Sequence, residues 1–60
     1  MEYKGKKVYI VLVNNREYTG VVYAVEKKEK CYLIKIKDKS GHLVGFYDTE
    51  IALIQEEEDN

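Results

Sequence analysis

Apolar side chains recur at every second position in five short segments of this chain, a period that predicts β-strands and argues against amphipathic helices. The first segment, residues 8–13, reads Val-Tyr-Ile-Val-Leu-Val and is rich in the β-branched residues that strands favour. Turn-forming or fully charged stretches separate the segments. We therefore expect strands over residues 8–13, 16–25, 31–37, 42–47 and 51–55.

The links between the expected strands are too short to contain long helices. Asn14 and Asn15 suit a hairpin turn, and residues 48–50 form a short connection before the last strand. Gly20 and Gly45 lie inside strands, where glycine favours a bulge or a bend. A sequence of 60 residues leaves no room for two large sheets, so we expect one antiparallel sheet, strongly bent into a small five-stranded barrel.

A barrel of this size is filled by side chains, and we expect its interior to contain Ile10, Leu12, Ile34 and Phe46. The other face of the first strand is apolar as well, and the chain has six tyrosines, a residue type that is favoured at interfaces. Two interpretations stay open: the tyrosines border the core of one subunit, or neighbouring subunits cover them. Residues 1–55 then form a single domain, and residues 56–60 form an acidic tail.

The charge balance differs between the body of the chain and its end. Ten Lys and Arg face eleven Asp and Glu, and four of these acids lie in residues 56–59, so the body has ten bases and seven acids. A mildly basic body favours the binding of a polyanion, although an ordinary solvated surface explains the same balance. No apolar run approaches the roughly 18 residues of a membrane helix, and the first residues do not resemble a signal peptide. We expect a cytoplasmic protein that does not bind membranes.

The residue types give no support for catalysis or metal binding. The chain has one cysteine, Cys31, one histidine, His42, and one serine, Ser40, so a zinc site would need carboxylates or ligands from other chains. The glycines are isolated and form no phosphate-binding loop. We expect a non-enzymatic protein without cofactor or metal. A single cysteine also excludes an internal disulfide, which leaves self-association as the way to stabilise so short a chain.

Lysines gather at three places in the sequence. They occupy residues 4–7, the charged link 26–30 and the third strand, where Lys35, Lys37 and Lys39 alternate and share one face. Lysine rows beside exposed tyrosines bind phosphates and let bases stack. Such rows also occur on the outward face of ordinary strands, where they block edge pairing. The pattern alone is compatible with both roles.

The order of residues in the first two strands resembles the first motif of the Sm and Sm-like (LSm) family. Leu12, Arg16 and Gly20 have the spacing of that motif, and residues 48–51 lie where the second family motif joins strands four and five. The resemblance covers nearly the whole chain after residue 5. It implies an Sm-like fold, an SH3-like barrel whose copies pair strand four with strand five of a neighbour. It also implies a hexameric or heptameric homo-oligomeric ring that binds single-stranded RNA, often uridine-rich, near its pore.

The positions that contact RNA in the family carry other residues in this chain. Glu26, Glu29 and Lys30 stand where the family has Asp, a stacking residue and Asn. Tyr47 and Asp48 stand where it has Arg and Gly. Glutamate does not stack on a base, and lysine lacks the paired donor and acceptor of an amide. We therefore expect sequence-tolerant contacts in place of the usual uridine pocket.

These observations predict a non-enzymatic, oligomeric nucleic-acid-binding protein, with single-stranded RNA as the expected ligand. Phosphates are expected on Lys27, Lys28 and Lys30, with Tyr47 as a stacking surface for bases. The alternative is a protein–protein interaction or structural barrel that keeps the fold without binding RNA, which the formal net charge of −1 favours. A small-molecule pocket inside the barrel is a weaker third alternative, because side chains fill the interior.

Overall fold

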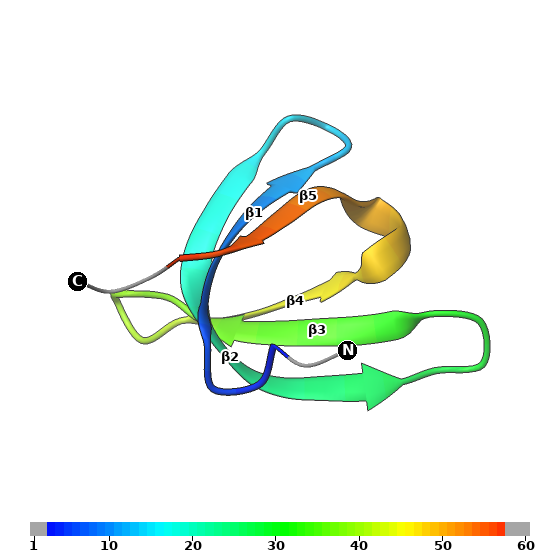
Figure 1. Cartoon of the computed structure of the whole chain (residues 1–60), viewed down its shortest axis with the longest axis horizontal. Coiled ribbons are helices and arrows are strands. Elements are labelled where there is room, and N and C mark those ends of the chain that lie inside the picture. Colours follow the sequence, from blue (N-terminus) through cyan, green and yellow to red (C-terminus); the bar gives the residue numbers. More distant parts are fainter. Residues whose placement is uncertain (1–2, 58–60) are drawn as a thin grey trace.

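The computed structural model describes residues 3–57 and contains five β-strands in one antiparallel sheet (Figure 1). The strands are β1 (Lys7–Leu12), β2 (Glu17–Lys27), β3 (Tyr32–Lys37), β4 (Leu43–Tyr47) and β5 (Ile51–Glu56). Their order across the sheet is β4-β3-β2-β1-β5. The all-β class and the five-stranded antiparallel arrangement that we predicted are confirmed.

The hydrophobic core lies against one side of the bent sheet. We call this side the inner face and the opposite side the outer face. The buried apolar residues of the inner face are Val8, Ile10, Leu12, Val22, Ile34, Ile36 and Phe46. This set includes all four residues that we predicted to fill the interior. Burial at every second position of β1 follows from the strand period of two, because successive side chains point to opposite faces.

Strand β2 contains a one-residue bulge, after which the side chains that would have pointed to one face of the sheet point to the other. It pairs first with β1 and then with β3, and its register with β3 shifts between Val22 and Ala24. Tyr23 is the extra residue at this shift. Val22 is buried in the core and Val25 packs against it, although their odd separation would place them on opposite faces of a regular strand. The curve of β2 is visible in Figure 1.

The two glycines inside strands have different surroundings. A Cβ atom on Gly20 of β2 would lie 2.6 Å from the carbonyl oxygen of Lys37 of β3. The close approach of β2 and β3 at this point therefore requires glycine. Gly45 pairs with Lys35 in an uninterrupted ladder between β3 and β4. No register shift accompanies Gly45, so this glycine does not mark a bulge.

Strands β4 and β5 are the two edges of the sheet and do not pair with each other within residues 3–57. One copy of the chain is therefore an open, bent sheet, and the predicted closed barrel is not formed by a single copy. A 3₁₀ turn over Asp48–Glu50 connects the two edge strands. The carbonyl oxygen of Glu50 accepts a hydrogen bond of 2.8 Å from the N–H of Val13, which ties this turn to the end of β1.

The first residues of the predicted acidic tail belong to the sheet. Strand β5 runs one residue further than expected, and Glu56 pairs with Val8 of β1. The N–H of Glu57 donates to the carbonyl oxygen of Lys7 at 2.8 Å, and the Glu56 carboxylate lies 3.3 Å from the Lys6 ammonium group. The remaining predicted tail residues, 58–60, lie outside the described part of the chain. No helix in the described part is long and apolar enough to cross a membrane.

Candidate nucleic-acid interface

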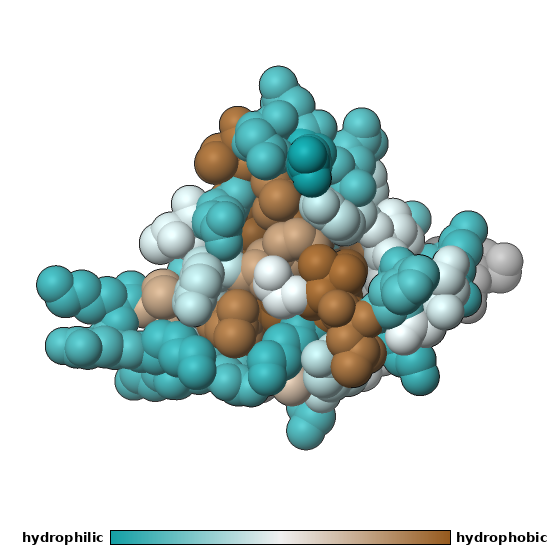
Figure 2. Space-filling view, turned by 180° about the vertical axis from the view of Figure 1, so that it is seen from behind, coloured by the Kyte–Doolittle hydropathy of each residue, from teal (hydrophilic) through white to brown (hydrophobic). Residues whose placement is uncertain are grey.

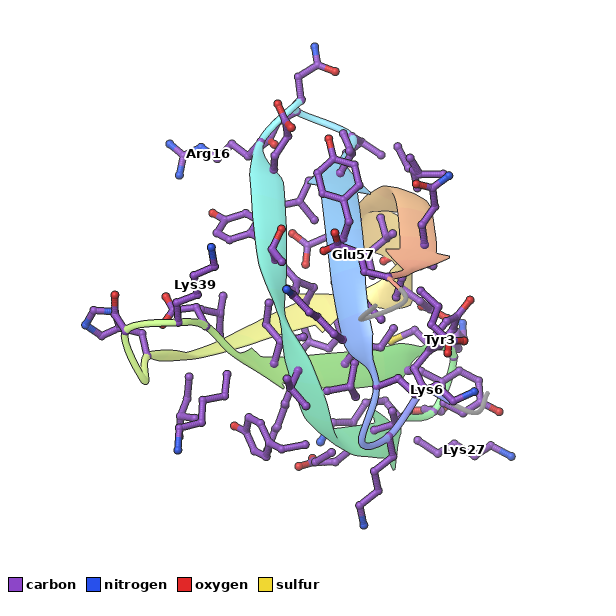
Figure 3. The ribbon with its side chains drawn as sticks, turned by 60° about the vertical axis from the view of Figure 1, so that its left-hand side comes forward. Tyr3, Lys6, Arg16, Lys27, Lys39 and Glu57 are labelled. Atoms are coloured by element: carbon purple, nitrogen blue, oxygen red, sulfur yellow. The ribbon has the colours of Figure 1, made fainter. Side chains whose placement is uncertain are left out.

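The three lysines predicted to hold phosphates lie at the tip of the β2–β3 hairpin. Lys27 is the last residue of β2 and pairs with Tyr32, while Lys28 and Lys30 lie in the loop. All three lysines are exposed. A hydrogen bond of 2.8 Å from the N–H of Lys28 to the carbonyl oxygen of Cys31 closes the loop. Figure 3 shows Lys27 at this end of the hairpin and Lys39 at the other end.

Tyr47, the predicted stacking residue, lies at the same end of the sheet as these lysines but on the outer face. It follows the buried Phe46, pairs with Leu33 and has 45% of its surface exposed. Lys27 shares the inner-face side of β2 with Val25, because residues two apart on a strand point the same way. The structure therefore gathers the four predicted residues at one end of the sheet, with Lys27 and Tyr47 on opposite faces.

Glu26 lies on the outer face in the same row across the sheet as Tyr47, with Leu33 between them, and two lysines neutralise its charge. Its carboxylate forms ion pairs with Lys28, at 3.1 Å, and with Lys35 of β3. Hydrogen bonds from Lys35 and then from Lys28 hold the pKa of the Glu26 carboxyl below its usual value. Lys28 is thus engaged within the chain, whereas Lys27 and Lys30 form no ion pair among residues 3–57.

The outer face also carries the lysine row that the alternation of β3 predicted. Lys35 and Lys37 alternate with the buried residues of β3, which confirms that these two lysines share the outer face. Lys39 follows the end of β3, in the turn before β4. In the register of the sheet Lys37 lies between Val21 of β2 and Leu43 of β4.

Several large apolar side chains remain on the surface of this single copy. They include Val21 and Leu43 beside Lys37, and Leu53 on the edge strand β5, with exposed fractions of 44%, 63% and 41%. Figure 2 shows apolar residues reaching the surface in the middle of one side of the molecule, with hydrophilic residues around them. Sequence reasoning did not single out Val21, Leu43 or Leu53, because the order of the strands in the sheet decides which apolar residues stay uncovered.

Asp38 has a structural role in the turn between β3 and β4. The Asp38 carboxylate accepts hydrogen bonds from the backbone N–H groups of Ser40, at 2.9 Å, and His42, at 2.8 Å. These bonds shape the β3–β4 turn and, led by the one from His42, lower the pKa of the Asp38 carboxyl. Within the described residues, no three His, Cys, Asp or Glu side chains are grouped to hold a metal ion.

Comparison with known proteins adds no family to this description. No protein-family model matches the sequence, and no curated protein or solved structure matches the chain. The likeness to the Sm and Sm-like family therefore stays a resemblance of sequence.

Proposed function

We propose that this chain is a non-enzymatic, self-associating β-sheet module that binds single-stranded nucleic acid, RNA before DNA. The observation that carries the proposal is the position of the exposed lysines at the β2–β3 tip, at the same end of the sheet as the exposed ring of Tyr47. Lysines hold phosphates through charge, and an exposed tyrosine offers a face on which any base stacks. Lys27 and Lys30 provide the unpaired charge, and Tyr47 provides the ring.

The two open edges of the sheet support self-association. Unpaired strand edges expose backbone donors and acceptors that pair readily with another chain. An arrangement that joins β4 of one copy to β5 of the next uses both edges, and a closed cycle of copies leaves none exposed. The Sm-like resemblance implies such a cycle, a hexameric or heptameric ring in which neighbouring copies complete a barrel.

The charges at the two edges are compatible with an antiparallel pairing between copies. Lys37 and Lys39 lie near the start of β4, while Glu56 and Glu57 lie at the end of β5. Antiparallel pairing of β4 with the β5 strand of a neighbour brings the start of one strand to the end of the other. The lysines of one copy then lie near Glu56 and Glu57 of the next, where opposite charges attract.

Two measurements test the proposal on the intact chain. Native mass spectrometry at low salt is expected to detect a closed homo-oligomer, and a monomer at all concentrations would contradict self-association. Fluorescence anisotropy with oligo-U, oligo-A and single-stranded DNA is expected to show binding that weakens steeply with salt. Absence of binding to all three ligands at low salt would contradict nucleic-acid binding.

A second candidate is a protein-interaction module without a nucleic-acid ligand. Its support comes from the acids around Tyr47: Glu26 lies in the same outer-face row, and Asp48 and Glu50 directly follow Tyr47 in the chain. Acidic groups beside a stacking surface repel phosphate. This module would form the same oligomer and leave all three oligonucleotides unbound, so the two measurements separate the candidates.

A further inference from the structure

Gly45 is the one glycine in the chain whose presence the single-copy structure does not explain. Gly5 and Gly41 adopt φ of 85°, which favours glycine, and Gly20 makes the close approach to Lys37. Gly45 has no positive φ. A Cβ atom there would meet its nearest atom, Cδ1 of Leu33, at 3.4 Å, an ordinary van der Waals contact.

Glycine weakens a regular strand, because it loses backbone freedom on folding and offers no side chain to pack. In strands it usually marks a bulge, a sharp bend or a place where another molecule approaches the backbone. The ladder between β3 and β4 is continuous from Leu43 to Tyr47, so no bulge accounts for Gly45. Gly45 is exposed between Leu43 and Tyr47, which leaves room for another group to approach its backbone.

The outer face around Gly45 combines lysines, leucines and an exposed tyrosine ring. We define the Gly45 patch as Leu33, Lys35 and Lys37 of β3 together with Leu43, Gly45 and Tyr47 of β4. Leu43 and Tyr47 flank Gly45 on the same face and are exposed, and between them the strand presents backbone without a side chain.

Charge complementarity selects the occupant of this patch. Lys37, which is exposed, forms no ion pair among residues 3–57, and Lys35 lies about 7 Å before it along β3. Lys35 is bound to Glu26, whose negative charge Lys28 and Lys35 neutralise. The patch therefore offers one unpaired ammonium group, that of Lys37, beside apolar side chains and a tyrosine ring, which suits an anionic ligand with a flat ring.

We propose that the Gly45 patch seats one base of a single-stranded nucleic acid. The base lies over the bare backbone of Gly45 and stacks against Tyr47, and the adjoining phosphates lie toward Lys37. This assignment rests on the proposed nucleic-acid binding and places the base on the outer face. Pairing of β4 with a neighbouring copy uses backbone groups in the plane of the sheet, whereas the base contacts the outer face.

The test compares Gly45→Val with the wild-type chain by fluorescence anisotropy. The ligands are a 12-nucleotide oligo-U (about 12 phosphates) and an abasic strand of the same length and charge. Filling the patch is expected to weaken binding of oligo-U by roughly tenfold, the size of one lost base–aromatic contact, and to leave abasic-strand binding unchanged. Thr19→Val, on the outer face of β2 away from the patch, is the matched control and is expected to change neither affinity.

The outcomes distinguish failure of the base site at Gly45 from failure of nucleic-acid binding as a whole. If Gly45→Val binds oligo-U as the wild type does, or loses affinity for both ligands equally, the base site is wrong and nucleic-acid binding by the lysines stands. If the wild-type chain binds neither ligand, both proposals fail. Native mass spectrometry and thermal unfolding show whether the variant keeps its assembly and fold. Should Gly45→Val not fold, Gly45→Ala provides the same comparison, because its Cβ fits at van der Waals contact.

Discussion

The backbone of Gly20 lies so close to Lys37 that a Cβ atom on Gly20 would come within 2.6 Å of the Lys37 carbonyl oxygen. Real side chains do not tolerate that distance, and a carbonyl group in the sheet has little freedom to move. We expect Gly20→Ala to lower the free energy of unfolding by about 1–3 kcal/mol, the usual range for overpacking. Urea unfolding followed by circular dichroism measures this loss.

Gly45→Ala is the matched control for that substitution. It adds the same methyl group to another strand glycine, where the nearest atom lies at 3.4 Å. We expect the free energy of unfolding to stay constant or to rise by about 0.5–1 kcal/mol, because alanine loses less backbone freedom than glycine. Equal losses in both variants would show that close packing at Lys37 is not what makes Gly20 necessary.

Removing the charges at the hairpin tip is expected to weaken nucleic-acid binding and its dependence on salt. For single strands, each lost phosphate contact reduces the slope of log affinity against log salt by about 0.7. We expect the variant Lys27→Ala, Lys28→Ala, Lys30→Ala to lose up to about 2 units of slope in anisotropy titrations with oligo-U.

The contribution of Lys28 to that change should be smaller than those of its neighbours, because Lys28 is bound to Glu26. Arg16→Ala removes a positive charge at the end of β2 opposite the hairpin tip and serves as the control. If Arg16→Ala reduces the slope as much as Lys27→Ala, binding is a general effect of charge and the hairpin tip is not its site.

A charge exchange tests the antiparallel pairing between copies. Lys39→Glu and Glu57→Lys each place like charges together at the proposed junction, and we expect each to weaken association by up to about fivefold per interface, the size of an exposed ion pair. The double variant restores opposite charges and should recover the wild-type mass distribution. Native mass spectrometry over a range of protein concentrations measures these shifts. A double variant weaker than both single variants would exclude this pairing.

Asp38 is expected to make the fold less stable in acid. Backbone hydrogen bonds from His42 and Ser40 hold its pKa below the ordinary value of about 3.9, so protonation breaks interactions present only in the folded chain. The stability that these hydrogen bonds contribute is fully present above the ordinary pKa of aspartate. It is lost as the pH falls through the lowered pKa of Asp38.

The variant Asp38→Asn keeps an oxygen that accepts the same backbone bonds but does not titrate. We expect the wild type to lose more stability than Asp38→Asn between pH 5 and pH 2, a range that spans the titration of aspartate. Glu26 also has a lowered pKa, but it is present in both chains, so the difference isolates Asp38. Parallel pH profiles of unfolding free energy would show that the Asp38 carboxylate has no such role.

Strand period and turn chemistry made most of the fold predictable. Alternation in β1 correctly placed Ile10 and Leu12 in the core, and the alternating β3 lysines Lys35 and Lys37 were correctly assigned to one face. Both predictions depend only on local geometry, because a strand turns successive side chains to opposite sides. The candidate site depends on more than local geometry and was predicted less completely.

Sequence by itself determined that the chain forms five short antiparallel strands with an alternating core, since backbone geometry and turn residues act over a few positions. Tertiary structure alone decided which side chains meet. The Tyr23 bulge moves Lys27 to the inner-face side of β2, while Tyr47 stays on the outer face. A shift of one residue reverses every later side chain of a strand, and its position depends on the pairing between β2 and β3, which no single segment of the sequence contains.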